Sequence, residues 1–237
     1  MKINLKILIA VKMALVMFVV FALCQCSDSR VGKIDHELKV YNQALKLGDI
    51  NTAITAMLRI ASLDTNEVSY YDSLATLYYM QRNYPASYKS AYKVLQRRPS
   101  ESAYEAAFRS ARELRMNKEA LDFALKLKDI RKEDLRLLYD IGILYFSLGE
   151  RAKAIEYMDK IILDEGSKKL IIEMNSEGKK QKVVARSLAL TNKGFILMEL
   201  NKLDEAETFL KEALKVQDHP LARNNLTLLY QLKKKAR

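Results

Sequence analysis

The stretch IGILYFSLGERAKAIEYMDKI, residues 141–161, decides the fold of this chain. Two segments with apolar residues at helical spacing lie on either side of Gly149, which is typical of two helices joined by a tight turn. Gly142 stands in the first segment and Ala154 in the second. Because both residues are small, the pattern predicts that the two helix backbones approach each other closely there.

The position of Ala154 recurs along the chain at regular intervals. The small residues at this position are Ala53, Ser87, Ala120, Ala154 and Ala206. The intervals between them are 34, 33, 34 and 52 residues. A fixed period in this range indicates a stack of identical supersecondary units. Such stacks expose a long concave face, and we therefore expect a protein that holds other molecules.

These repeats resemble the tetratricopeptide repeat family, which pairs two antiparallel helices in each unit. The second repeat matches through Leu74, Ala75 and Tyr78, and residues 221–232 resemble the lone first helix of a sixth unit. The resemblance covers residues 34 to 232. It implies an all-α fold, namely a right-handed superhelical stack of about five helix-turn-helix units with a C-terminal capping helix.

The 52-residue interval contains about 18 residues more than the repeat requires, between Gly166 and Val184. Its centre, Asn175-Ser176-Glu177-Gly178, is a turn sequence, and β-branched residues flank it. We therefore expect a β-hairpin inserted between the fourth and fifth units. A longer helix pair is the alternative, because residues 179–200 contain no helix breaker except Gly194.

The N-terminus has the layout of a secretory signal. Lys2, Lys6 and Lys12 precede an uninterrupted apolar run of 11 residues, Met13 to Leu23. No acidic residue occurs before Asp28. A straight membrane-spanning helix needs about 20 apolar residues, so this run is short. We assign residues 1–26 to the signal, 27–33 to a tether and 34–237 to the repeat domain.

The sequence around Cys24 and Cys26 resembles a bacterial lipoprotein signal, in which a lipidated cysteine becomes the mature N-terminus. Leu23 then stands in the preferred apolar slot upstream of Cys26, so we predict lipidation of Cys26, with Cys24 as the alternative. The resemblance implies a lipid-anchored protein of the bacterial cell envelope, facing the periplasm or the cell surface. An uncleaved inner-membrane anchor remains open and would give the same topology.

The family resemblance also predicts which side chains lie on the concave groove. These candidates are mostly aromatic or basic: Tyr79, Arg109, Arg112, Tyr139, Phe146, Phe195 and Met198. An aromatic and aliphatic stripe bordered by arginine suits an extended peptide or an amphipathic helix. The alternative is that these side chains pack against the next repeat.

Composition and motifs argue against catalysis. The chain has only two histidines, His36 and His219, far apart in the sequence, and neither has metal-ligand spacing. No glycine-rich phosphate loop or nucleophile motif occurs, so we expect no enzyme, no cofactor and no metal. The net charge is +11, and the basic residues are spread along every repeat. Without a recognition motif, nucleic acid is not the expected partner.

The sequence thus predicts a membrane-anchored scaffold that binds a protein or peptide partner in the cell envelope, within outer-membrane biogenesis, secretion or surface assembly. The alternative is a lipoprotein that captures a small ligand, a glycan or a peptide fragment, in the concave groove. The sequence leaves the oligomeric state open.

Overall fold

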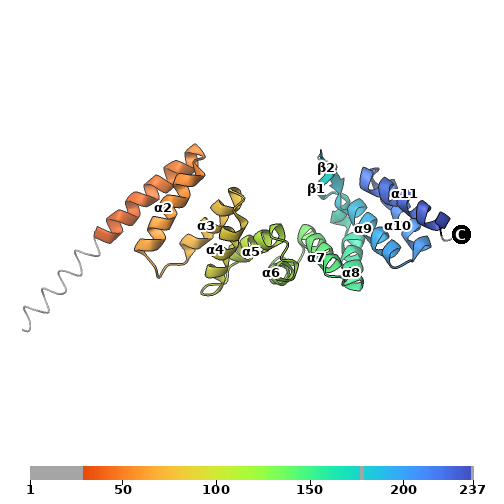
Figure 1. The fold of residues 1–237 in the computed structure, drawn as a ribbon, viewed down its shortest axis with the longest axis horizontal. Helices are drawn as coiled ribbons and strands as arrows, with labels where there is room; N and C mark the ends of the chain where they lie inside the picture. The colour runs from red at the N-terminus through yellow and green to blue at the C-terminus, as the bar shows by residue number, and fades with distance from the viewer. Residues whose placement is uncertain (1–28, 177–178, 236–237) are drawn as a thin grey trace, which may run out of the picture. The chain divides into compact units, whose positions relative to one another are not determined.

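The structure, a computed structural model, describes residues 29–176 and 179–235. The chain forms two compact units, of which the first ends at Ala106 and the second begins at Ala107. We call them the N-terminal unit and the C-terminal unit. Figure 1 shows the helices of each unit in chain order, with one short pair of strands in the C-terminal unit.

The N-terminal unit contains a helix over residues 29–47, then α2 (Ile50–Leu63), α3 (Ser69–Met80) and α4 (Tyr84–Leu95), and it includes the first half of α5 (Glu101–Glu113). The C-terminal unit continues from α5 with α6 (Asn117–Ile130), α7 (Leu135–Ser147), α8 (Arg151–Leu163), the 3₁₀ turn η1 (Glu165–Lys168), β1 (Ile171–Ser176), β2 (Lys179–Val184), α9 (Ala185–Glu199), α10 (Leu203–Val216) and α11 (Pro220–Lys235).

Within the described residues the helices follow the five predicted helix-turn-helix repeats, and α11 follows as the predicted cap. The five small residues that set the period, Ala53, Ser87, Ala120, Ala154 and Ala206, all have an exposed fraction of 0%. A larger side chain at any of them would separate the two helices of its repeat. The predicted repeat stack is confirmed.

A residue with a positive, left-handed φ follows the first helix of every repeat. These residues recur with the same period as the small ones. The positive-φ residues are Gly48, Arg82, Arg115, Gly149 and Asn201, each five positions before a buried small residue. The residue that follows each of them donates its backbone N–H to a carbonyl five residues back, as Glu150 does to Tyr145 at 2.9 Å. This bond satisfies a carbonyl that the helix end leaves free, and it turns the chain into the second helix.

Ser87 is the one polar residue among the five small ones. Its hydroxyl donates a 2.7 Å hydrogen bond to the Ala75 carbonyl oxygen in the facing helix. Burying a hydroxyl without a partner is costly, and this bond removes that cost. A serine therefore fits a position where the other repeats carry alanine.

Gly142 and Gly194 mark the closest approaches of the paired helices in repeats four and five. A Cβ at Gly194 would lie 2.7 Å from Leu210 Cγ, and a Cβ at Gly142 would lie 3.2 Å from Tyr157 Cβ and would clash with Met158. Only glycine leaves this space. The prediction of close backbone contact at Gly142 and Ala154 is confirmed.

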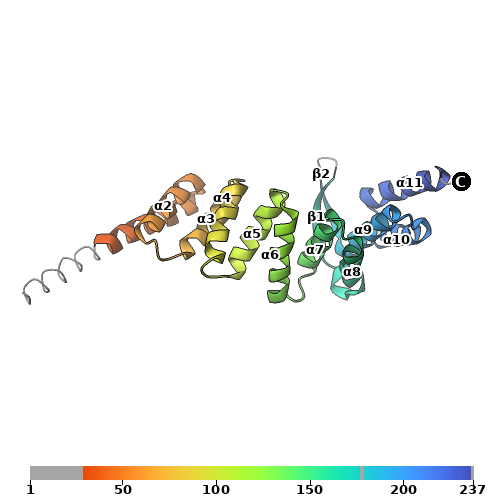
Figure 2. The same ribbon diagram turned by 60° about the horizontal axis from the view of Figure 1, so that its bottom comes forward.

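The predicted β-hairpin is also confirmed, and residues 179–184 form a strand rather than the start of a longer helix. Strands β1 and β2 pair antiparallel, with Ile172 opposite Val183 and Glu173 opposite Lys182. Ile172 is 3% and Val183 1% exposed, because both face the helices and join a core cluster with Met158 and Leu188. In both views the hairpin projects beside α7 and α9 (Figure 2).

The capping helix α11 covers the end of the repeat stack through Ala222 and Leu229, both 0% exposed. Lys233 lies near the end of this helix. Its ammonium group forms ion pairs with Asp204 at 2.6 Å and with Glu207 at 2.5 Å, both on α10. The two carboxylates thus tie the end of the cap to the fifth repeat.

The signal prediction for residues 1–26, with Cys24 and Cys26, lies outside the described residues. Residues 29–33, which we assigned to a tether, are helical and lie in the first helix of repeat one. All five are exposed, so helix continuity rather than burial joins them to the repeat. No helix in the described part of the chain is long and apolar enough to cross a membrane.

Candidate functional site

A cleft of about 370 Å³ lies in the C-terminal unit between α7 and the hairpin strand β1. We call it the α7–β1 cleft. Its lining residues lie on α5, α6, α7, β1 and α9. They include Arg112, Arg136, Tyr139, Asp140, Ile143, Ser147, Ile172, Glu173 and Met174. The cleft therefore brings Arg112 and Tyr139, two of the predicted groove residues, together with the segment that interrupts the repeat.

Local sequence places these side chains. The Asp134 carboxylate accepts a 3.0 Å hydrogen bond from the Leu137 N–H and so caps the start of α7. Arg136, Tyr139 and Ile143 then follow at helical spacing along one face. On the opposite wall, the alternation of a strand turns Ile172 and Met174 towards the helices, and both pack in one apolar cluster with Tyr139 and Ile143.

The cleft carries two arginines with different surroundings. Arg112 forms an ion pair of 2.8 Å with Asp140 of the next repeat, and its guanidinium lies 5.6 Å from the centre of the Phe108 ring. Arg136 is exposed and forms no ion pair with any described residue. Glu173 lies 3.8 Å from Lys182 on β2, so its charge is partly compensated. Arg136 thus leaves the cleft with an uncompensated positive charge.

Tyr139 contributes its ring to the cleft wall and its hydroxyl to the fold. The hydroxyl accepts a 2.9 Å hydrogen bond from the Asn192 side-chain amide on α9. Burial raises the pKa of Tyr139 to about 12, so the hydroxyl stays protonated at neutral pH. Tyr139 therefore forms part of the apolar floor of the cleft with its ring and joins α7 to α9 with its hydroxyl.

The other predicted groove residues do not converge on this cleft. Phe146 and Phe195 contact each other edge to face, with ring centres 5.8 Å apart, and so join α7 to α9. Met198 is 6% exposed and lies in the core with Leu210 and Leu229, because repeat five packs closely at Gly194. It is not a groove residue.

Two predicted groove residues lie elsewhere. Arg109 is exposed on α5 and does not line the cleft. Tyr79 lies in the N-terminal unit, where its ring centre is 5.4 Å from that of Tyr84. Of the seven candidates, only Arg112 and Tyr139 line the α7–β1 cleft.

Sequence reasoning missed Arg136, Asp140, Glu173 and Met174. Arg136 and Asp140 lie one turn apart on the same helix as Tyr139, so helical spacing could have found them. Glu173 and Met174 come from the insertion, and the repeat pattern gives no information about where an insertion folds back. Only the pairing of β1 with β2 brings them to α7.

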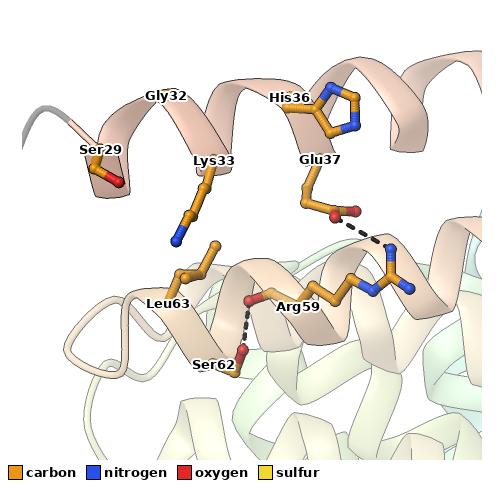
Figure 3. A pocket seen from close by; sticks show the side chains of 8 residues that line it. All are labelled: Ser29, Gly32, Lys33, His36, Glu37, Arg59, Ser62 and Leu63. Atoms are coloured by element: carbon orange, nitrogen blue, oxygen red, sulfur yellow. Dashed lines mark hydrogen bonds and ion pairs between the residues drawn. The ribbon is translucent and has the colours of Figure 1, made fainter.

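A second cavity of about 460 Å³ lies in the N-terminal unit, between the helix over 29–47 and α2. Figure 3 shows Lys33 and Glu37 pointing from the first helix towards Leu63 and Arg59 on the second, while His36 lies alongside the first helix. Glu37 Oε1 accepts a 3.2 Å hydrogen bond from Arg59, while Glu37 Oε2 is buried and has no hydrogen-bond partner among the described residues. None of the predicted groove residues lines this cavity.

Among the described residues, no three His, Cys, Asp or Glu side chains gather where they could hold a metal ion. The α7–β1 cleft presents an apolar floor, the Arg136 guanidinium and a strand of the hairpin to a ligand.

Comparison with known proteins agrees with the repeat architecture. The tetratricopeptide repeat family model matches residues 135–163 and 188–219, which correspond to repeats four and five. The search of curated proteins found no match. The hairpin falls between the two matched segments, as expected for an insertion.

Solved structures share the fold at low sequence identity. A crystal structure of MamA is 20% identical with a TM-score of 0.62, over 78% of this chain and 92% of that one. YrrB, described as a TPR protein with an unusual peptide-binding site, is 15% identical with a TM-score of 0.65, over 79% and 89%. MamA from Desulfovibrio magneticus RS-1 is 16% identical with a TM-score of 0.61, over 79% and 98%. The fold is a stack of tetratricopeptide-type repeats.

Proposed function

We propose that this chain is a binding scaffold that holds a protein or peptide partner in the α7–β1 cleft. The observation that carries the proposal is the cleft itself, in which an apolar floor of Tyr139 and Ile143 lies beside the uncompensated charge of Arg136. An apolar floor with a few fixed polar groups is the usual composition of a recognition site. The peptide-binding site named for YrrB, a similar fold, supports the same role.

A small ligand is the second candidate occupant, and the size of the cleft favours it. A volume of about 370 Å³ falls at the low end of the range typical of small-molecule sites, roughly 300 to 1,000 Å³. Thermal-shift screening of glycans and short peptides separates the two candidates. A saturable response to a glycan in the purified chain, lost in Arg136→Glu, would favour the small-ligand function over the scaffold.

We further propose that a lipid on Cys26 anchors the scaffold to a membrane of the bacterial cell envelope and that the repeats lie outside the cytoplasm. The apolar run followed by Cys26 supports this. Two or more acyl chains, at about 0.8 kcal/mol per buried CH₂, would hold the chain stably. The partner would then be an envelope protein, and binding rather than catalysis would be the function.

Co-purification from solubilised native membranes tests the scaffold. The full chain should recover a specific protein, and Arg136→Glu should reduce recovery about tenfold, because a favourable charge contact becomes a repulsive one. Lys126→Glu is the matched control, since Lys126 is an exposed cation of α6 that does not line the cleft. Equal recovery by all three forms would refute the proposed site.

A further inference from the structure

The two outer edges of the hairpin differ in their hydrogen bonds to the rest of the fold. On β2, the Gln217 side chain accepts a 2.6 Å hydrogen bond from the Val184 N–H and donates one of 3.1 Å to the Lys182 carbonyl. Gln217 thus occupies the place of a neighbouring strand. This contact covers the outer edge of β2 at Lys182 and Val184.

The register shows which backbone groups lie on the outer edge of β1. Val184 and Lys182 turn their backbone groups away from β1, so their partners Ile171 and Glu173 form pairs without cross-strand hydrogen bonds. The N–H and C=O groups of Ile171 and Glu173 therefore point away from β2. No described residue forms a hydrogen bond with these backbone groups.

The sequence protects one edge and leaves the other open. Proteins commonly blunt a free edge with lysine, and all three lysines of the hairpin, Lys179, Lys180 and Lys182, are on β2. Strand β1, with the sequence IIEMNS, has none. Its Ile171 side chain is 44% exposed. An open edge without such protection is a template for another strand.

We propose that the partner binds as an extended segment that adds a third strand to the outer edge of β1. The proposal rests on the proposed function, because it states how the α7–β1 cleft takes a peptide. Glu173, Ile172 and Met174 line that cleft, so a strand on β1 would run along it. Backbone bonds to Ile171 and Glu173 would give affinity, and side-chain pockets would give specificity.

The cleft also indicates the chemistry of the segment. Alternate side chains of a strand point to one face, so apolar ones would contact Ile143 and Met174. Arg136 is the cation without an ion-pair partner, whereas Arg112 is held by Asp140. The segment should therefore be uncharged or apolar at alternating positions and carry one aspartate or glutamate that reaches Arg136.

A proline substitution isolates the backbone contact. Glu173→Pro removes an N–H that points away from β2, so the bonds between β1 and β2 remain, and proline is tolerated at such edge positions. Glu173→Val is the matched control, because it removes the same carboxylate and keeps the N–H. Circular dichroism and thermal melts should show both variants folded.

The probe is a random 12-residue peptide library, selected on the full-length chain in detergent micelles. Selected peptides should carry an acidic residue, and their affinity for Glu173→Val, which keeps the N–H, is the reference against which Glu173→Pro is measured. Glu173→Pro should weaken them about tenfold, the loss expected for about one backbone hydrogen bond. On binding, amide hydrogen exchange at Ile171 and Glu173 should slow.

The possible results distinguish a failure of strand addition from a failure of the proposed binding function. One outcome is that peptides bind Glu173→Pro as tightly as Glu173→Val but lose affinity on Arg136→Glu. This result would support the cleft as the binding site and overturn strand addition. Failure to select any peptide would count against both. A dimer of the chain itself that dissociates in Glu173→Pro, detected by light scattering, would show a second copy as the occupant and overturn the proposed partner.

Discussion

The Tyr139 hydroxyl accepts a 2.9 Å hydrogen bond from the side-chain amide of Asn192, and this bond joins α7 to α9 beside the α7–β1 cleft. Tyr139→Phe removes the acceptor and leaves Asn192 without it. We expect the free energy of unfolding to fall by about 1 kcal/mol. Peptide affinity should stay within about twofold of wild type, because the ring that forms the cleft floor remains.

Tyr145→Phe is the control for this change. The Tyr145 ring packs 5.5 Å from that of Tyr157, and no described residue bonds to its hydroxyl. Urea unfolding should show no loss of stability in Tyr145→Phe. An equal loss in both variants would mean that the bond to Asn192 contributes nothing specific.

At the left-handed turn positions, we expect two substitutions to change the free energy of unfolding in opposite directions. Arg115 has φ of 58° and Gly149 has φ of 80° at equivalent places in repeats three and four. A side chain in this conformation costs about 1 kcal/mol relative to glycine. Arg115→Gly should therefore raise the unfolding free energy by up to about 1 kcal/mol, and Gly149→Ala should lower it by a similar amount. Denaturant midpoints that move in the same direction for both would contradict the turn assignment.

Glycine to alanine should also have opposite effects at Gly194 and Gly32. Alanine favours a helix by roughly 1 kcal/mol over glycine, while overpacking a core costs about 1 to 3 kcal/mol. At Gly194 the new methyl group would meet Leu210 at 2.7 Å, so destabilisation should win. At Gly32 no atom lies within 4 Å, so the helix preference should win. Thermal melts of the two variants measure this difference in sign.

Much of this fold is predictable from sequence, and the exceptions have physical causes. The period of small residues predicts the repeats because the two helices of each unit cross closely at the same place, where only a small side chain fits. The turns at Arg82 and Arg115 could not be seen, since only Gly48, Gly149 and Asn201 are residue types that favour positive φ. The two arginines adopt it because the bonded helix end imposes it.

The candidate site was less predictable than the fold. The family pattern selects the concave face of each first helix, which finds Arg112 and Tyr139. It cannot show that Met198 is buried, because that depends on how closely α10 and α11 pack around it. Nor can it place Glu173, because a hairpin outside the repeat has no register in the pattern.

Stability should depend on pH through His219. The imidazole is 3% exposed, its Nε2 lies 3.2 Å from Thr191 Oγ1, and its Nδ1 has no partner among the described residues. Burial lowers the pKa of His219, although Asp218 acts in the opposite direction. Below the unfolded value of about 6.5, the unfolded chain therefore binds more protons, and the free energy of unfolding should fall as the pH drops.

His219→Gln removes this titration and should flatten the pH dependence. Urea unfolding of both forms between about pH 7.5 and 5 measures the slopes. A steeper decline in His219→Gln than in wild type would contradict a neutral buried imidazole.

The anchor proposal predicts a single labelled cysteine. Cells grown with an alkyne fatty acid should label wild type and Cys24→Ser, and Cys26→Ser should lose the label together with membrane association, because the acyl chains supply the binding energy. Label retained in Cys26→Ser and lost in Cys24→Ser would move the site to Cys24. An unlabelled wild-type chain would overturn the lipid anchor.

The central claim is that the α7–β1 cleft holds the partner, and site-specific photo-crosslinking in native cells tests it most directly. A crosslinker at Ser147, an exposed residue of α7 that lines the cleft, should give one discrete product. The same group at Lys126 should not give it, and Arg136→Glu should abolish the Ser147 product. No product from Ser147, or the same product from both positions, would contradict the claim.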